Sequence, residues 1–261
     1  MSATSPELIC EKANGIMRLT LNRPERRNAL SDSLMEQLAR AFEAAGADPE
    51  VRVIVLGATG EKAFCAGADL NPKAGTFQFD YAKPSSIYAN MLRAARETPV
   101  PVIARVNGFC LAGGMGLLAV SDMAVAATSA KFGLPEVKIG LFPMQVAALL
   151  QSIVPARKFA EMCFTGEPFS AQEAFDYGLV NYVVPPEELD AKTDWLAARI
   201  ADKSPTAIRR GKYALTAMEG MSAPQRIAYM ESQVGLLPLT EDAKEGMMAF
   251  AEKRAPQWTG R

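Results

Sequence analysis

A glycine-rich turn, Ala112–Gly116, contains the residues whose types and spacing could do chemistry. The apolar run before it, Val100–Val106, is typical of a buried strand, and Met115–Val120 is typical of a helix. Glycines at a helix start let a ligand approach the backbone, and the unpaired N–H groups there attract negative charge. Such a turn could stabilise an oxyanion that develops during a reaction. The same glycines would also let the helix pack closely on a neighbour, and this stretch alone slightly favours that second interpretation.

A second turn of small residues, Phe64–Leu70, also follows an apolar strand, Val51–Leu56. The order of elements around it is strand, helix (Ser33–Ala45) and strand, which is typical of an α/β protein. Ligands of such sheets bind in a crevice beyond the strand ends, so the two turns could face each other there. The segment Asn71–Ser86 is irregular and aromatic, and we expect it to form a flap over a pocket.

The chain contains no histidine. This excludes a Ser–His or Cys–His nucleophile, a histidine-ligated metal and an imidazole general base. The four cysteines (Cys10, Cys65, Cys110 and Cys163) form no CxxC motif, so we expect neither a metal site nor a disulfide framework. Any proton transfer must therefore use a carboxylate, lysine, tyrosine or cysteine.

The composition allows one full hydrophobic core. The 261 residues are 49% hydrophobic, which suits one large domain or one domain with a helical appendage. The formal net charge of −1 gives no electrostatic reason to expect nucleic acid or an anionic membrane as a partner. No apolar run approaches the ~18 residues of a membrane span, and Met1–Pro6 lacks the charged-then-apolar order of a signal peptide. We therefore expect a cytoplasmic protein.

From Pro143 onward the sequence predicts helices, with one short strand at Asn181–Val184. This part is more typical of a packing and oligomerisation layer than of a separate domain. The predicted helices are Pro143–Gln151, Ala156–Cys163, Ala171–Tyr177, Pro186–Asp202, Pro205–Met218, Pro224–Leu236 and Thr240–Lys253.

Two other functions deserve comparison with oxyanion chemistry. Gly114, Gly116 and Ala119 fit the dinucleotide-binding pattern G-x-G-x-x-A as text, but the first glycine does not leave its strand directly as that motif requires. A Walker-type phosphate loop is excluded because no Gly-Lys-Ser/Thr occurs. A protein that binds a ligand without chemistry remains the second class of function.

Several motifs, in the same order and over nearly the whole chain, resemble the enoyl-CoA hydratase/isomerase (crotonase) superfamily. They are Phe64–Leu70, Asn107–Gly114, Ser121–Asp122, Phe132–Glu136, Gly140, Thr165–Gly166, Ala171–Ala174, Gly178–Val180 and Glu245–Arg254. The resemblance implies an α/β fold, a spiral of ββα units, with an acyl-CoA site in a core over residues 1–200. It also implies that a helical region, residues 201–261, builds a homotrimer or a dimer of trimers and reaches the adenine end of coenzyme A.

The resemblance places the oxyanion hole at the backbone N–H groups of Ala68 and Gly113. A thioester carbonyl that becomes an enolate needs two fixed donors where charge develops, and a helix N-terminus suits one of them. Removing one such donor typically raises the barrier by about 3 kcal/mol. Small residues also suit this task, because larger side chains would block the carbonyl.

The resemblance implies a path for coenzyme A, which arrives as part of the substrate; no separate cofactor and no metal is expected. Arg26 and Arg27 match a loop that contacts pantetheine and phosphate, and forked guanidinium donors suit phosphate. Phe250 and Lys253 match positions that reach adenine, often from a neighbouring subunit. The remaining predicted contacts are Ala29, Ala66, Asp69 and Leu70.

The acid/base group is where this chain departs from family hydratases, which hold and activate a water with two glutamates. The second matches Glu136, but the first aligns with Gly116. One glutamate suffices to move a proton between C2 and C4, so we favour an enoyl-CoA isomerase that shifts a Δ3 double bond to Δ2. A dienoyl-CoA isomerase is disfavoured because Met144 stands where an aspartate is expected.

Two alternatives remain open beside the isomerase. One is a hydratase acting on 2-enoyl-CoA, including one with an unusual branched acyl chain, in which Glu161, Gln145 or a tyrosine from the flap holds the water. The other is a non-catalytic member of the family that binds acyl-CoA.

Overall fold

The structure is a computed structural model that describes residues 5–70 and 81–261. Most of the predicted flap, residues 71–80, lies outside this description. Among the described residues, none of the helices has the length and apolar character needed to cross a membrane.

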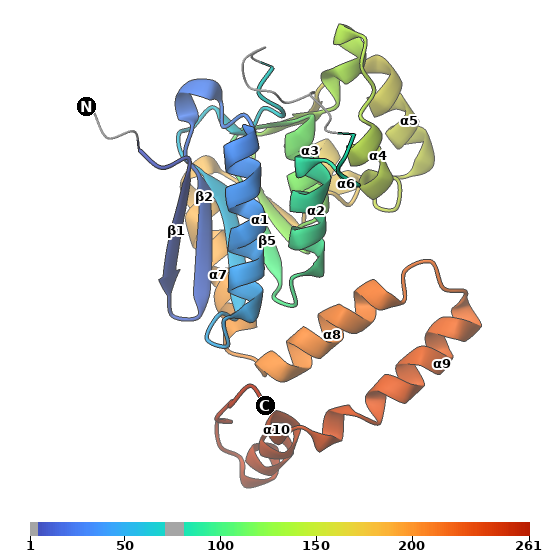
Figure 1. Cartoon of the computed structure of the whole chain (residues 1–261). Helices are drawn as coiled ribbons and strands as arrows, with labels where there is room; N and C mark the ends of the chain where they lie inside the picture. The colour runs from blue at the N-terminus through green and yellow to red at the C-terminus, as the bar shows by residue number, and fades with distance from the viewer. Residues whose placement is uncertain (1–4, 71–80) are drawn as a thin grey trace.

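Two sheets form the body of the molecule (Figure 1). The six-stranded sheet has the order β1-β2-β3-β5-β7-β10, in which only β1 and β2 pair antiparallel. Its strands are β1 (Leu8–Ala13), β2 (Ile16–Leu21), β3 (Val53–Ala58), β5 (Val102–Val106), β7 (Met123–Ala127) and β10 (Tyr182–Val184). The four-stranded sheet has the order β4-β6-β8-β9, with β4 (Ala63–Cys65), β6 (Phe109–Leu111), β8 (Lys131–Gly133) and β9 (Phe169–Ser170).

The chain alternates between the two sheets in repeated ββα units. β3 and β4 precede α2, β5 and β6 precede α3, and β7 and β8 precede α4. Each unit gives one strand to each sheet. This is the spiral of ββα units that the family resemblance implies, and it places the ends of the strands and the starts of the helices at one edge of the body.

The large sheet is covered on both faces because its strands are apolar on both faces. Ile54 and Leu56 belong to the main core, which also contains Leu34 and Leu38 of α1 (Asp32–Ala47). Alternate residues such as Val53 face the opposite way, toward a second cluster with α7 (Leu189–Ala201). In Figure 1, α1 and α2 (Ile87–Glu97) lie on one side of the sheet and α7 on the other.

The remaining helices complete the body and an extension. They are α3 (Gly113–Ala119), α4 (Met144–Leu150), α5 (Ala156–Thr165), α6 (Ala171–Asp176), α8 (Pro205–Ala217), α9 (Ala223–Val234) and α10 (Glu241–Glu252), with short 3-10 turns η1 (Pro24–Arg26), η2 (Pro135–Ile139), η3 (Pro186–Glu188) and η4 (Leu237–Leu239). The helices predicted from Pro143 onward are all present within a few residues.

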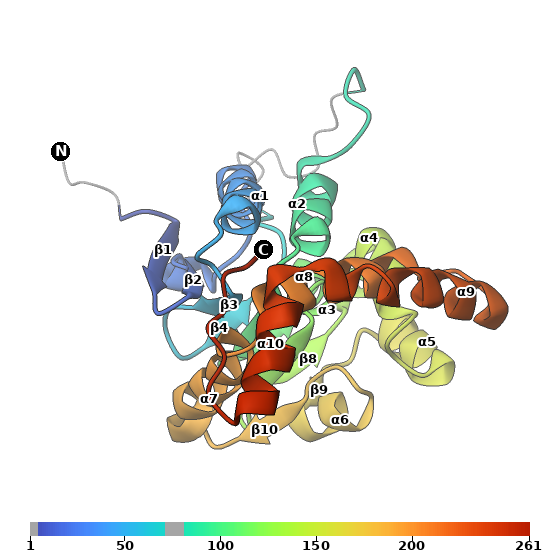
Figure 2. The same ribbon diagram turned by 90° about the horizontal axis from the view of Figure 1, so that it is seen from below.

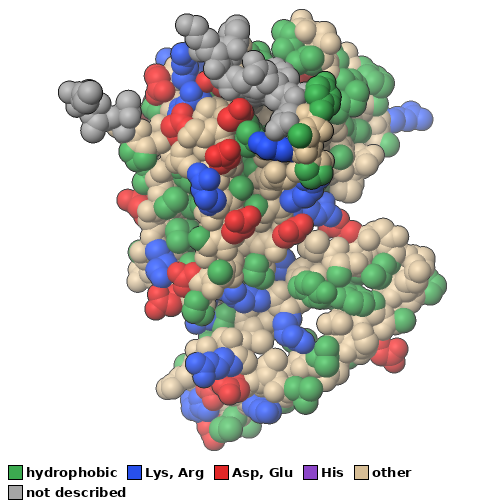
Figure 3. Space-filling model, in the orientation of Figure 1, with side chains coloured by type: hydrophobic (Ala, Val, Ile, Leu, Met, Phe, Trp, Pro, Cys, Tyr) green, Lys and Arg blue, Asp and Glu red, His purple; other side chains and the backbone are tan. Residues whose placement is uncertain are grey.

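Helices α8, α9 and α10 extend away from the body, as Figures 1 and 2 show. The buried Asp242 joins this extension to the C-terminal tail, because its carboxylate accepts hydrogen bonds from Ser204 Oγ at 2.8 Å and from the N–H of Thr259 at 2.8 Å. Hydrophobic side chains gather on the surface over α8 and α9 (Figure 3). Exposed large apolar residues of the extension include Tyr213, Leu215, Ile227, Val234, Leu239, Met247 and Phe250.

Candidate active site

The two small-residue turns meet in the structure, as the sequence predicts. Gly67 has φ +97°, and a Cβ added there would lie 2.6 Å from Ala112 Cβ and 3.2 Å from the Gly113 nitrogen. Only glycine allows this backbone conformation and this approach. The turn is held on either side of Ala68, because Leu30 N–H donates to Gly67 O at 2.8 Å and Asp69 N–H donates to Leu30 O at 3.0 Å.

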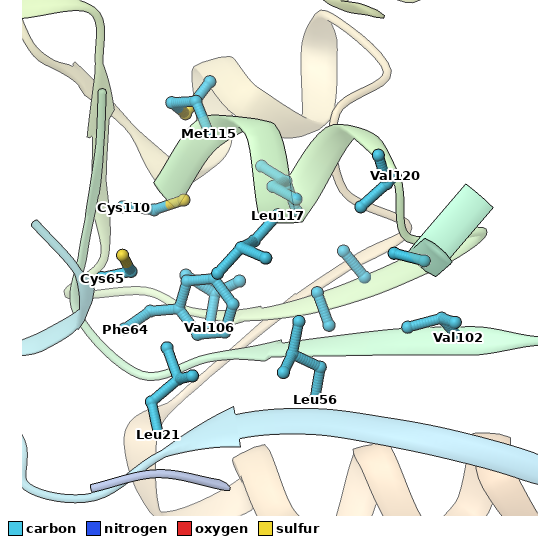
Figure 4. Packing of buried hydrophobic residues seen from close by; sticks show 14 of the residues in the cluster. Leu21, Leu56, Phe64, Cys65, Val102, Val106, Cys110, Met115, Leu117 and Val120 are labelled. Carbon is cyan, nitrogen blue, oxygen red and sulfur yellow. The ribbon is translucent and has the colours of Figure 1, made fainter. Parts of the chain in front are cut away.

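The start of α3 is fixed against the neighbouring strand. A Cβ added at Gly114 would overlap the carbonyl oxygen of Cys65 and lie 2.9 Å from its Cβ. Figure 4 shows Cys65 and Phe64 packed beneath α3 with Leu117. The close-packing interpretation of the glycine turn is therefore confirmed for Gly114, while Gly113, the first helical residue, leaves its N–H exposed to the facing turn.

Two backbone donors remain unused at this junction. Within the described part of the chain, neither the Ala68 N–H nor the Gly113 N–H donates to a protein acceptor. Ala112, just before Gly113, has φ 49° and ψ −121°, a conformation that costs a non-glycine residue energy. Its own N–H donates to Gly133 O at 3.0 Å. Backbone strain kept in place by such contacts is common at functional sites.

Glu136 lies in η2, directly after β8. Its side chain is partly buried, and Oε2 is buried without a hydrogen-bond partner among the described residues. Desolvation raises the pKa of the Glu136 carboxyl above its ordinary value. Its main chain is fixed because Leu141 N–H donates to Glu136 O at 3.0 Å. The result is a partly buried carboxyl group, one oxygen of which has no hydrogen-bond partner among the described residues, and this suits a general base.

Tyr88, in the first turn of α2, is a site residue that the sequence analysis did not identify. Its hydroxyl donates to Gly113 O at 2.8 Å. Burial raises the pKa of Tyr88 well above its ordinary value, and the negative charge of Glu136 adds to this shift. Tyr88 therefore fixes the start of α3 through Gly113 and interacts electrostatically with Glu136. The one feature of the sequence that could have indicated such a residue is Gly116, because a buried glycine in a helix leaves a space that a side chain from another element must fill.

The loop that carries Arg26 and Arg27 lies beside the small-residue turn Phe64–Leu70. Arg26 and Arg27 are both exposed, and Arg27 has φ 53°. Ala66 N–H donates to Arg27 O at 3.1 Å, and the N–H of the buried Ala29 donates to Arg26 O at 3.1 Å. The structure thus places these four predicted contacts of coenzyme A next to the site.

Asp69 and Leu70 differ in their surroundings. The Asp69 carboxylate forms an ion pair with Arg23 at 2.8 Å, and Arg23 also pairs with Glu7 at 2.8 Å. Asp69 is buried, whereas Leu70 is 57% exposed. Arg23, which the sequence analysis did not single out, therefore fixes the loop that carries Ala68.

Phe250 and Lys253 do not join this site within one chain. Both lie on or next to α10, whose end of the molecule is opposite the end where α3 and α4 meet (Figure 1). Phe250 is 86% exposed.

Comparisons with known proteins identify the family of this chain. Residues 11–261 match the family model described as enoyl-CoA hydratase/isomerase. The chain is 36% identical over 258 residues to the mitochondrial enoyl-CoA hydratase domain-containing protein 3 of Xenopus laevis, covering 98% of this chain and 87% of that protein. This chain belongs to the enoyl-CoA hydratase/isomerase family.

Other members of the enoyl-CoA hydratase/isomerase family are similar over the whole length. The chain is 35% identical to the (E)-benzylidenesuccinyl-CoA hydratase of Thauera aromatica, over 96% of this chain and 98% of that protein. The crystal structure of the enoyl-CoA hydratase from Bacillus anthracis superposes with a TM-score of 0.91 at 32% identity, over 98% of this chain and all of that one. The chain is therefore an acyl-CoA enzyme of this family with the crotonase fold.

The raised pKa of Glu136 predicts an effect on stability. A carboxyl whose folded pKa lies above its unfolded value stabilises the fold at acidic pH, and this contribution is lost as the pH rises through the folded pKa. At pH 7 the ionised group therefore costs stability. We expect Glu136→Gln to raise the free energy of unfolding at pH 7 and to lose this advantage at pH 4.

Urea unfolding at both pH values tests this, with Glu187→Gln as the control because Glu187 is exposed. A Glu136→Gln variant that is less stable than wild type at pH 7 would contradict a desolvated, unpartnered carboxylate.

Proposed function

We propose that this enzyme shifts the double bond of a 3-enoyl-CoA to the 2 position through a thioester enolate. The observation that carries the proposal is the buried Glu136 Oε2, which has no partner among the described residues, together with two unused N–H groups at the junction of the two turns. The position of the first glutamate of family hydratases is Gly116, which has no side chain to offer. The site therefore has one proton carrier and a place to stabilise negative charge.

The chemistry follows from these groups. The thioester oxygen accepts hydrogen bonds from the N–H groups of Ala68 and Gly113, which makes the C2 proton more acidic. The Glu136 carboxylate removes that proton, and the electron pair forms a dienolate whose charge lies largely on the thioester oxygen. The Glu136 carboxylic acid then returns the proton at C4, which leaves the double bond between C2 and C3. The oxyanion hole acts on the charge that develops in both steps.

Hydration of a 2-enoyl-CoA is the second candidate, because similar proteins carry the name hydratase. That reaction needs a second group to hold the water. Glu161 instead pairs with Lys158 at 2.9 Å on an exposed surface, and Gln145 Nε2 donates to Ser86 Oγ at 2.8 Å. Both side chains already have partners, which favours isomerisation. A non-catalytic acyl-CoA-binding role would not explain why Glu136 Oε2 is buried without a hydrogen-bond partner among the described residues.

We further propose that the active unit is a homotrimer or a dimer of trimers. The exposed apolar side chains of the extension support an interface with other copies, since large exposed apolar patches mark association sites. In such an assembly Phe250 and Lys253 of one copy can reach the coenzyme A of another. Coenzyme A is then the only cofactor-like group and enters with the substrate. The cytoplasmic location expected from the sequence stays a prediction.

Isotope exchange separates the candidates. In heavy water, wild type should convert 3-enoyl-CoA to 2-enoyl-CoA with deuterium uptake and without 3-hydroxyacyl-CoA. We expect Glu136→Gln to reduce this turnover at least about a thousandfold, because it removes the carboxyl that carries the proton, while acyl-CoA binding changes little. Glu161→Gln is the control and should keep wild-type rates. Full activity of Glu136→Gln would overturn the mechanism, and loss of activity in Glu161→Gln would favour the hydratase.

A backbone substitution tests the donor at Gly113. Proline lacks an N–H but is tolerated at the first position of a helix, which Gly113 occupies. We expect Gly113→Pro to lower kcat by roughly 100- to 1,000-fold relative to Gly113→Ala, which keeps the N–H and whose Cβ would lie 3.4 Å from Leu30 Cδ1. Circular dichroism checks that both variants fold. Equal activity of folded proline and alanine variants would remove Gly113 from the oxyanion hole.

A further inference from the structure

The space beside Gly116 is already filled by Tyr88. A Cβ added at Gly116 would overlap the Tyr88 hydroxyl oxygen and lie 3.1 Å from its Cζ and 3.4 Å from Leu92 Cδ2. Gly116 is buried on the face of α3 that packs toward α2. Any side chain at position 116 therefore requires the Tyr88 ring to move.

Tyr88 is held firmly in that position. Its hydroxyl donates to Gly113 O at 2.8 Å, which uses its single proton. Its helix begins at a Ser86 cap, where Ala89 N–H donates to Ser86 Oγ at 3.2 Å. Gln145 Nε2 donates to the same Ser86 Oγ at 2.8 Å and thereby joins α2 to α4. The ring is thus a fixed part of the site wall.

The chemistry of a buried phenol differs from that of the glutamate expected at position 116. The Tyr88 hydroxyl stays neutral, since burial and the negative charge of Glu136 raise its pKa. A neutral phenol whose proton is donated to Gly113 O cannot remove a proton from water. The space beside Gly116 is therefore occupied by a side chain that cannot act as a base.

We propose that Tyr88 determines the reaction specificity of this enzyme: its hydroxyl occupies the place of a second acid, excludes a held water and fixes the first turn of α3. The inference rests on the isomerase function proposed above and deepens it. Tyr88 acts as a specificity-determining and positioning residue. Its hydroxyl contacts Gly113, whose N–H the mechanism uses. It also interacts electrostatically with Glu136, the proton carrier.

Three variants test this with 3-enoyl-CoA and 2-enoyl-CoA, by measuring the ratio of hydration to isomerisation. Tyr88→Ala combined with Gly116→Glu should raise this ratio at least about tenfold, because the new carboxylate gains the space that the Tyr88 ring leaves. Gly116→Glu alone should not raise it, since Tyr88 keeps that space. Tyr88→Phe should lower kcat for isomerisation about fivefold with little change in KM. Tyr182→Phe, at a tyrosine of β10 whose ring packs against Trp195 of α7, is the control and should match wild type.

Thermal unfolding gives a second readout that does not require activity. Gly116→Ala should lower the Tm more in wild type than in the Tyr88→Phe background, where the overlapping oxygen is absent. An equal decrease in Tm in the two backgrounds would overturn the argument that Tyr88 fills the space beside Gly116. An unchanged hydration ratio in a folded double variant, or an equal gain in Gly116→Glu alone, would overturn the specificity role.

The outcomes also separate this inference from the function on which it rests. A wild type that isomerises, combined with a double variant whose ratio is unchanged, contradicts the role of Tyr88 alone. A wild type that neither isomerises nor exchanges deuterium contradicts the proposed function, and the specificity role falls with it. A wild type that hydrates faster than it isomerises contradicts both.

Discussion

The direct contact of two backbone turns is the constraint on which the rest of the site depends. Gly67 packs against Ala112 and Gly113, and Gly114 packs against Cys65. Side chains at Gly67 or Gly114 would push the turns apart. Because the turns follow strands of the smaller sheet, the register of β4 beside β6 sets their distance. The whole spiral of ββα units thus serves to bring two short segments of main chain together.

The site is kept in a state that costs stability. Ala112 has a strained backbone, the Ala68 and Gly113 N–H groups have no acceptor in the described protein, and Glu136 Oε2 is buried without a partner. A protein selected for stability alone would have a relaxed backbone at this position and hydrogen-bond partners for these polar groups. The extensive core around β3 and β5 offsets these costs. An incoming thioester would supply an acceptor for the donors and a proton for the carboxylate.

The sequence predicted the strong elements and the facing turns but not the whole site. Apolar runs identified β3 and β5, and the sequence also predicted the helices from Pro143 onward; the structure confirms all of these. The strands β4, β6, β8 and β9 were not predicted, because strands of two or three residues are too short to show a period. Tyr88 was missed for a different reason. Its importance comes from a contact with Gly113 across 25 positions of the chain, and no local pattern marks such a contact.

The central claim is that the Ala68 and Gly113 N–H groups converge on one thioester oxygen. Infrared spectroscopy of a bound saturated acyl-CoA, labelled with carbon-13 at the thioester carbonyl, tests it most directly, because this ligand binds without reacting. Two hydrogen bonds polarise the carbonyl, so we expect its stretching band to move to lower wavenumber than in water, and to move back in Gly113→Pro. A bound carbonyl that absorbs at the same wavenumber as the free ligand in water would contradict the account.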